Sequence, residues 1–353
     1  MTHEFKEILE SYQIAKQQGI TAVMATVVDI EGSSYRRPGV GMLILQNGKM
    51  TGAVSGGCVE KEVWRQAQSV FMTGISKMMT YDGKYRLGCE GILYILIEPF
   101  DMSQDQIVSI QQYLVSRTSF EIESCYSKNV YDHSDLGSIV KFTETKVFSY
   151  SYRTSPNVNT DLSCFVRKIV PCFKLLIIGT EHDAIQLCQL ASATGWEVDI
   201  VSSPKSPIQL DKFPGAQRVI ESLPEDLDIS FIDTQTAIVL MSHNFAKDLL
   251  YLQALTETCP AYIGLLGPSQ RREKLLSALI EYFPEVTDSF LDTIHGPAGL
   301  NLGAETPQEI AISIIAEILS VIRNQEPISL QEKSGAIHDH YNKKTINVIS
   351  TKT

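Results

Sequence analysis

Apolar positions in the first half of the chain recur with two periods, one typical of helices and one typical of strands. Helices are predicted over residues 3–18, from Cys58 to a glycine stop at Gly74, and over residues 104–116. Between them the pattern is β-rich, and Asn47-Gly48 is a strong hairpin signal. The predicted strands cover residues 21–30, 41–45, 50–54, 77–81, 92–97, 119–126, 137–142, 145–152 and 162–169. This half is therefore predicted to be an α+β domain.

From residue 173 the pattern changes to short apolar runs that alternate with helical ones. Residues 174–178 form a fully apolar strand, which is followed by a polar turn and a helix that Gly195 ends. Further strands are predicted at residues 196–201, 229–232, 236–241 and 261–266. Strands that alternate with helices predict a doubly wound parallel sheet of the Rossmann type.

The last helix of this half has the clearest start signal in the chain. Thr306 and Glu309 form a capping box, and Pro307 takes the first helical position, where its missing donor costs nothing. Residues 310–322 are apolar almost all round, so this helix is predicted to be buried. The chain as a whole is α/β, with an N-terminal domain at 1–171, a Rossmann-like domain at 172–325 and a polar tail at 326–353.

Composition narrows the class of protein. The chain has 353 residues, of which 44% are hydrophobic and 20% charged, as in ordinary globular proteins. A formal net charge of −11 argues against nucleic-acid binding, and no apolar run approaches the roughly 20 residues that span a bilayer. Seven cysteines with scattered spacing indicate neither a disulfide framework nor a zinc site. The first residues lack the basic and apolar regions of a secretory signal, so we expect a cytoplasmic protein without a membrane span.

The segment Val54-Ser55-Gly56-Gly57-Cys58-Val59-Glu60 is the strongest candidate for chemistry. Two adjacent glycines allow a ligand to approach the backbone, and Cys58 falls in the first turn of a helix, whose dipole favours a thiolate or a ligand phosphate. The alternative is a tight turn with a small buried cysteine. The neighbouring loop at residues 31–39, with Arg36 and Arg37, favours the ligand site because arginine suits phosphate oxygens.

Polar turns follow four strands of the predicted parallel sheet, at the edge where such sheets bind ligands. These turns are residues 179–183, 202–204, 242–244 and 267–271. In a dinucleotide fingerprint the second glycine lets the backbone reach the pyrophosphate, and Glu181 stands there instead. Its carboxylate would repel the phosphates, so we do not expect NAD(P) to bind.

Five motifs resemble, in order and spacing, the XdhC/CoxI family of xanthine dehydrogenase accessory proteins. They are EGSSYRRPG, GAVSGGCVE, GCEG, YIGLLGPSQRR and HGPAGLNLGAETPQEIAISIIAEI, within residues 5–325. The resemblance implies a domain of the family's own type followed by a Rossmann domain. It also implies a protein that binds the molybdenum cofactor (molybdopterin), protects it while an oxo ligand is exchanged for sulfido, and delivers it to a molybdenum hydroxylase. The chain departs from the family pattern at Tyr35, Glu90, Glu181 and Ser202-Ser203.

A xanthine dehydrogenase-like client is the expected partner, with a cysteine desulfurase as a further candidate and a second copy of the chain in a homodimer. No catalytic residue stands out, and Cys58 is also the candidate molybdenum ligand. The candidate cofactor-binding residues are Ser33, Arg36, Arg37, Gly56, Gly57, Cys58, Glu60, Cys89, Gly179, His182, Asp183, His243, Gly267 and Arg271. We expect them to line one pocket between the two domains. Two alternatives stay open, an NAD(P)-linked oxidoreductase and a non-catalytic assembly component of a molybdenum enzyme.

Overall fold

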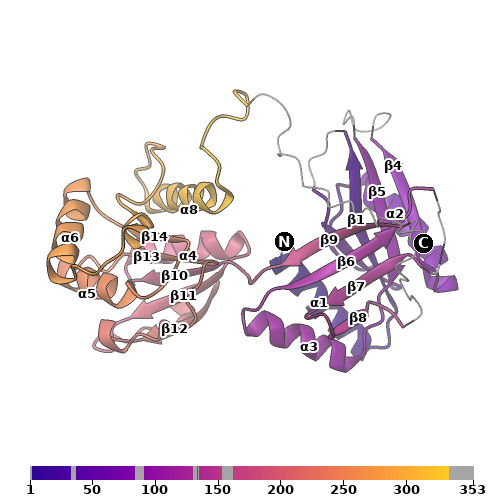
Figure 1. Cartoon of the computed structure of the whole chain (residues 1–353), viewed down its shortest axis with the longest axis horizontal. Helices are drawn as coiled ribbons and strands as arrows, with labels where there is room; N and C mark the ends of the chain where they lie inside the picture. The colour runs from indigo at the N-terminus through magenta and orange to yellow at the C-terminus, as the bar shows by residue number, and fades with distance from the viewer. Residues whose placement is uncertain are drawn as a thin grey trace, which may run out of the picture. The chain divides into compact units, whose positions relative to one another are not determined.

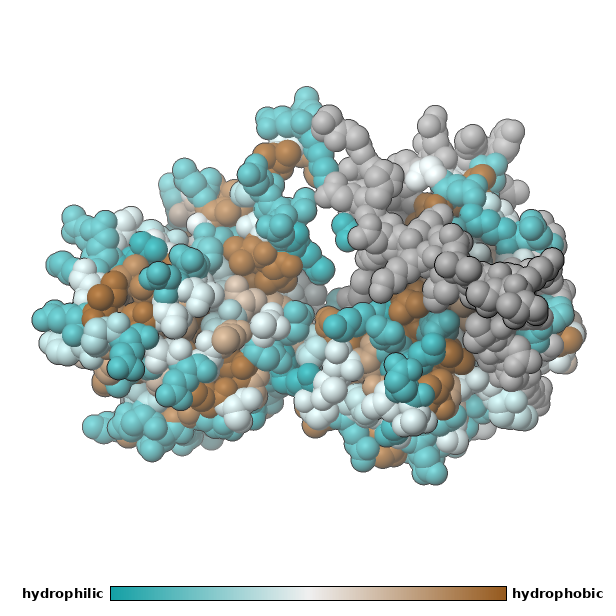
Figure 2. All heavy atoms as spheres, in the orientation of Figure 1, coloured by the Kyte–Doolittle hydropathy of each residue, from teal (hydrophilic) through white to brown (hydrophobic). Residues whose placement is uncertain are grey.

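The computed structural model describes residues 2–32, 37–83, 91–129, 133, 135–152 and 162–333 (Figure 1). The chain divides into two compact units, one formed by the residues up to Pro171 and one by Cys172–Ser329. Each unit has its own buried core. On the face shown in Figure 2, hydrophilic side chains cover most of the described surface of each unit, with apolar patches among them.

The first unit contains a five-stranded antiparallel sheet with the order β3-β2-β1-β5-β4. Its strands are β1 (Ala22–Glu31), β2 (Gly41–Leu45), β3 (Met50–Gly52), β4 (Lys77–Asp82) and β5 (Ile92–Pro99). Side chains alternate between the two faces of a strand. Val23 and Ala25 of β1 therefore pack against α2 (Cys58–Thr73), whereas Met24 packs on the opposite face, against α1 (Thr2–Gln17).

A second antiparallel sheet completes the first unit and has the order β8-β7-β6-β9. Its strands are β6 (Phe120–Tyr126), β7 (Gly137–Lys141), β8 (Val147–Ser149) and β9 (Ser163–Ile169). The helix α3 (Gln104–Val115) starts at a capping box formed by Ser103 and Gln106. Phe120 and Ile122 of β6 share one core with α1 and α3, so this sheet, α1, α3 and one face of the five-stranded sheet enclose a single apolar layer.

The second unit is a six-stranded parallel sheet with the order β12-β11-β10-β13-β14-β15. Its strands are β10 (Lys174–Ile178), β11 (Glu197–Ser202), β12 (Ala216–Glu221), β13 (Thr236–Leu240), β14 (Tyr262–Leu265) and β15 (Ile294–His295). Counted within this unit the order is 3-2-1-4-5-6, the Rossmann arrangement. The predicted fold class, an α+β domain followed by a doubly wound parallel sheet, is confirmed.

Helices cover both faces of the parallel sheet (Figure 1). They are α4 (His182–Ala193) and α8 (Pro307–Arg323) on one face, and α5 (Phe245–Leu255), α6 (Ser269–Tyr282) and the short α7 (Asp288–Leu291) on the other. Two short 3-10 turns occupy Leu210–Lys212 and Pro224–Asp226. The predicted capping box of the last helix is present, because Thr306 and Glu309 bond each other's backbone N–H groups. None of the helices in the described part of the chain is long and apolar enough to cross a membrane.

One predicted strand of the second unit is wrong. Residues 229–232 form a turn, and the edge strand is β12, which the hydrophobic pattern did not indicate. Ile232 is buried within the turn and packs into the core with Ile229, so this apolar run reflects burial and not strand geometry. Gln217 and Arg218 of β12 are exposed because β12 lies at the edge of the sheet.

Candidate functional site

The strand pairing of the five-stranded sheet brings three chain segments toward one end of that sheet. Met42, at the start of β2, pairs with Gly52 at the end of β3. Ile92, at the start of β5, pairs with Glu31 at the end of β1 and with Asp82 at the end of β4. The segments that leave from this end are residues 32–40, 53–57 and 83–91, which contain the arginine loop, the Gly-Gly-Cys turn and Cys89. Segments far apart in the sequence thus share one region of the first unit.

Cys58 is exposed at the first position of α2. Gly57 precedes the helix, and the helix start carries no side-chain hydrogen bond as a cap. A Cβ atom added at Gly56 or Gly57 would meet no other atom within 4 Å, so space is open around both glycines. Val59 is fully buried and anchors the turn in the core below α2. The alternative interpretation of Cys58, a small buried cysteine, is therefore wrong.

The remaining candidates of the first unit fall into two groups. Arg37 and Glu60 are described, and both are half-buried. Ser33, Arg36 and Cys89 lie outside the described residues. The roles of all five stay predictions.

A cluster around Lys128 lies at the same end of the sheet, and sequence reasoning missed it. Lys128 Nζ lies 2.9 Å from the buried Asp29 carboxylate, also pairs with Glu31, and lies 4.2 Å from the centre of the Tyr94 ring. Burial alone lowers the pKa of Lys128, but the hydrogen bonds to Glu31 and Asp29 outweigh it and raise that pKa. Because Glu31 immediately precedes the arginine loop, Lys128 holds one end of that loop. No sequence signal links residues so far apart.

Three neighbouring strand ends meet at the carboxyl edge of the parallel sheet. Ile178 of β10 pairs with Leu240 of β13, which in turn pairs with Leu265 of β14. The turns that follow these strands contain Gly179, His243 and Gly267. His243 is exposed and adopts a φ of 53°, a backbone conformation that residues other than glycine rarely adopt.

Arg271 is held at this edge by a buried carboxylate. Its Nη2 donates to Asp248 Oδ2 at 2.6 Å, and the Asp248 side chain is only 3% exposed. Ser242 Oγ donates to the other oxygen of Asp248. Arg271 Nε is buried without a hydrogen-bond partner in the described part of the chain. The ion pair balances the charge of the guanidinium, so Arg271 offers a ligand a directed N–H donor more than a net positive charge.

The start of α4 is acidic, which matters for phosphate binding. Glu181 precedes the helix, is exposed, and makes no side-chain hydrogen bond to the helix start. Asp183 is half-buried in the first turn, and His182 between them is exposed. Acidic side chains here stabilise the helix dipole, but they occupy the place where a Rossmann fold binds a pyrophosphate.

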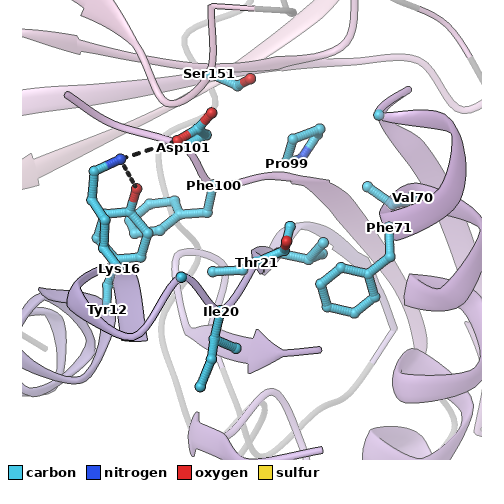
Figure 3. Close-up of a pocket in the computed structure, with 14 residues that line it drawn as sticks. Tyr12, Lys16, Ile20, Thr21, Val70, Phe71, Pro99, Phe100, Asp101 and Ser151 are labelled. Atoms are coloured by element: carbon cyan, nitrogen blue, oxygen red, sulfur yellow. Dashed lines mark hydrogen bonds and ion pairs between the residues drawn. The ribbon is translucent and has the colours of Figure 1, made fainter. Parts of the chain in front are cut away.

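A cavity of about 310 Å³ opens elsewhere in the first unit, between the carboxyl end of α2 and the end of α1 (Figure 3). It reaches Val70 of α2, which lies about 18 Å along the helix axis from Cys58 at 1.5 Å per residue. Lys16 is paired with Asp101 at 3.2 Å and bonds the Tyr12 hydroxyl at 3.5 Å, so the polar groups of the cavity satisfy one another. The candidate residues of the first unit do not line this cavity.

Two family models match the chain. The model of the XdhC and CoxI family matches residues 15–82, and the model of the XdhC Rossmann domain matches residues 175–318. The chain belongs to the XdhC/CoxI family. The first matched segment contains the arginine loop and the start of α2, and the second contains the turns at the carboxyl edge of the parallel sheet.

Relatives in the family match over nearly the whole chain. A protein of Bacillus subtilis described as a probable xanthine dehydrogenase component is 27% identical over 84% of this chain and 92% of its own length. The molybdenum cofactor insertion chaperone PaoD of Escherichia coli is 27% identical over 92% of this chain and 91% of its own length. A crystal structure of a xanthine dehydrogenase from Bacillus halodurans is similar with a TM-score of 0.75 and 27% identity, covering 91% of this chain and 97% of that one.

We expect iodoacetamide to modify Cys58 faster than Cys188 in the native protein. Cys58 is exposed at a helix start, which favours the thiolate. Cys188 is fully buried, and that burial raises the pKa of its thiol to about 11. Timed alkylation followed by peptide mass spectrometry measures both rates. Cys259, which is exposed but lies at no helix start, is the matched control. Equal rates at Cys58 and Cys259 would show that the helix contributes nothing to the reactivity of Cys58.

Proposed function

We propose that the protein binds the molybdenum cofactor, supports its sulfuration, and delivers it to a molybdenum hydroxylase of the xanthine dehydrogenase type. Membership of the XdhC/CoxI family supports this role, as do relatives named for cofactor insertion and for xanthine dehydrogenase. A client hydroxylase is then the main partner, a cysteine desulfurase is the source of sulfur that the reaction needs, and the working form is a homodimer.

The start of α2 is the observation that carries this proposal. An exposed cysteine follows two glycines with open space around them, at a helix start that no side chain caps. A molybdopterin has a phosphate and a soft dithiolene–molybdenum centre. The helix start suits the anionic groups, and a thiolate is a soft ligand that suits such a centre. The residues therefore fit the cofactor.

Each residue has a distinct part in holding the cofactor. The Arg37 guanidinium binds phosphate oxygens through its planar fork, together with Arg36. Gly56 and Gly57 let the pterin approach the backbone, which a side chain would prevent. Cys58 presents its sulfur at the open helix start. The bound cofactor would supply the molybdenum centre itself, while the protein supplies the site that retains it until transfer.

A second candidate function, binding of NAD(P), is favoured by the Rossmann strand order and by Gly179 at the end of β10. The two carboxylates around the start of α4 oppose it, because like charges held a few ångströms apart repel strongly where water is scarce. We therefore place the cofactor site on the first unit and expect no tight dinucleotide binding.

Binding measurements on the purified full-length chain test the proposal. We expect wild-type protein and the Cys259→Ser control to retain molybdopterin through gel filtration, and Cys58→Ser to retain it at least about tenfold less well, which corresponds to about 1.4 kcal/mol. Bound pterin is measured by fluorescence after oxidation, and NADH binding by calorimetry on the same samples. Tight NADH binding without pterin binding would overturn the proposal in favour of an oxidoreductase.

A further inference from the structure

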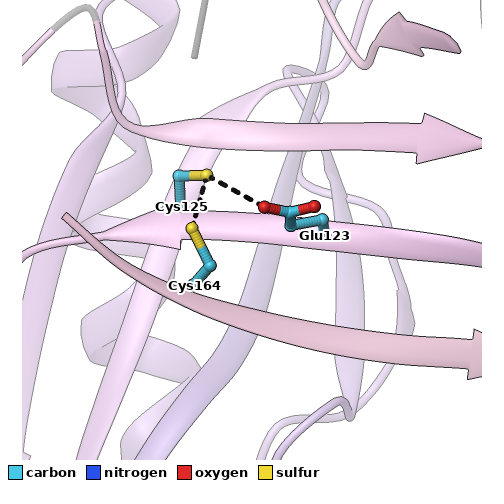
Figure 4. Close-up of side chains that lie close together, drawn as sticks. All are labelled: Glu123, Cys125 and Cys164. Carbon is cyan, nitrogen blue, oxygen red and sulfur yellow. Dashed lines mark hydrogen bonds between the residues drawn. The ribbon is translucent and has the colours of Figure 1, made fainter. Parts of the chain in front are cut away.

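Two cysteines lie opposite each other on neighbouring strands of the four-stranded sheet. In the antiparallel pairing of β6 and β9, Cys125 is the direct partner of Cys164. Their sulfur atoms are 3.1 Å apart, and both thiols are free (Figure 4). Directly opposed residues of antiparallel strands have Cα atoms about 4.5 to 5.5 Å apart, within the range that a disulfide spans.

The two sulfurs differ in access. Cys125 is 2% exposed on the central strand β6. Cys164 is half-buried on β9, which is the edge strand of the sheet, so a small molecule reaches Cys164 first. Cys164 is thus placed to react with an incoming molecule and Cys125 to react with Cys164.

The charges around the pair favour one thiol and one thiolate. The hydrogen bond that the Cys125 thiol donates to Cys164 lowers the pKa of Cys164, and the same bond together with burial raises the pKa of Cys125. Glu123 Oε1 lies 4.0 Å from Cys125 Sγ and disfavours a second negative charge. Lys141 pairs with Glu123, which limits that effect.

A metal site is the competing interpretation, because Glu123, Cys125 and Cys164 place three donor atoms within 4.8 Å of one another. Zinc–sulfur bonds of about 2.3 Å at the tetrahedral angle hold two sulfurs about 3.8 Å apart. The observed separation of 3.1 Å is shorter than that, and a disulfide of about 2.05 Å requires the sulfurs to approach by only about 1 Å more. The Lys141 ammonium also occupies the carboxylate that a cation would need.

We propose that Cys125 and Cys164 form a redox-active dithiol site, separate from Cys58, whose substrate is a low-molecular-weight disulfide. The Cys164 thiolate attacks one sulfur of the small disulfide, which forms a mixed disulfide and releases one thiolate. The Cys125 thiol gives its proton to that thiolate and attacks Cys164 Sγ, which expels the second thiolate. The protein dithiol loses two electrons to become a disulfide, and the small disulfide becomes two thiols.

Peptide mapping after treatment with glutathione disulfide tests this proposal on the full-length protein. Tryptic cleavage places Cys125 in residues 118–128 and Cys164 in residues 154–167, with one cysteine in each peptide. We expect mass spectrometry without reduction to show these two peptides linked, and dithiothreitol to separate them. Absence of the link, with cysteines elsewhere oxidised first, would overturn the proposal. This measurement on wild-type protein does not depend on any variant.

Two serine variants test the order of attack. In Cys125→Ser, we expect glutathione to remain attached to Cys164, because no second thiol displaces it. In Cys164→Ser, we expect Cys125 to react at least about tenfold more slowly than Cys164 does in the first variant, because Cys125 is buried. Reduced wild-type protein is also incubated with Zn²⁺ alone and desalted. Retention of one zinc that both variants lose would overturn the dithiol assignment in favour of a metal site.

Discussion

Glu98→Gln is expected to stabilise the first unit at pH 8 relative to pH 4.5 by about 3 kcal/mol compared with wild type. Glu98 lies on β5 and is fully buried. Its two carboxyl oxygens accept bonds from Ser138, at 2.7 Å from the backbone N–H and 2.6 Å from the hydroxyl. Burial raises the pKa of Glu98 to about 7, against a partial lowering by those two bonds.

The sign of the pH dependence follows from this raised pKa. Below the ordinary value of 4.5, Glu98 is protonated in both the folded and the unfolded chain. Between about 4.5 and about 7 the unfolded chain ionises while the folded chain stays neutral, so the free energy of unfolding falls by about 1.4 kcal/mol per pH unit. Above about 7 this group adds no further change. Glutamine keeps the neutral form and its hydrogen bonds, because the Ser138 hydroxyl can accept from the amide and donate to Ser124 Oγ, 2.7 Å away.

Urea unfolding at the two pH values measures the effect. Trp64 lies in the first unit and Trp196 in the second, so a Trp196→Phe background leaves Trp64 fluorescence as a reporter of the first unit. Glu121→Gln removes an exposed glutamate from the same unit and is the matched control, for which we expect no comparable difference between the pH values. An equal effect of Glu98→Gln at both pH values would show that Glu98 is ionised in the folded protein.

The hydrophobic pattern predicted most of the fold because burial on both faces leaves a plain signal. The strand at 174–178 is buried along its whole length, and the observed strand has the same bounds. The capping box at Thr306 was also readable, because it depends on residues three positions apart. The edge strand Ala216–Glu221 left no such signal, since its outward residues are polar and its partner β11 lies earlier in the chain.

The candidate site could be predicted only where a local motif carries it. Cys58 at a helix start follows from two glycines and the helical pattern after them. Pairs that depend on strand register carry no local signal, as between Cys125 and Cys164. The same holds for Arg271 and Asp248, which come from separate helices. Sequence reasoning took Arg271 as a ligand residue, and it could not foresee that a buried carboxylate would balance its charge.

Gly179→Ala is expected to destabilise the second unit by about 4 kcal/mol or more. Gly179 has a φ of 140° and follows β10 at the carboxyl edge of the sheet. A Cβ atom at this position would lie 2.4 Å from the Met241 carbonyl oxygen and 2.6 Å from its carbon. Both contacts are with backbone, and the Met241 N–H donates to the Ile178 carbonyl at 2.8 Å. The clash cannot be relieved without separating β10 from the end of β13.

Gly303→Ala is the matched control for this prediction. Gly303 lies in the same unit with a φ of 70°, but an added Cβ atom would meet nothing within 4 Å. We therefore expect Gly303→Ala to cost only about 1 kcal/mol, from the backbone conformation alone. Urea unfolding in a Trp64→Phe background reports on the second unit through Trp196. Equal losses for the two variants would show that the backbone conformation, and not the close approach of β10 to Met241, is what requires glycine at the end of the first Rossmann strand.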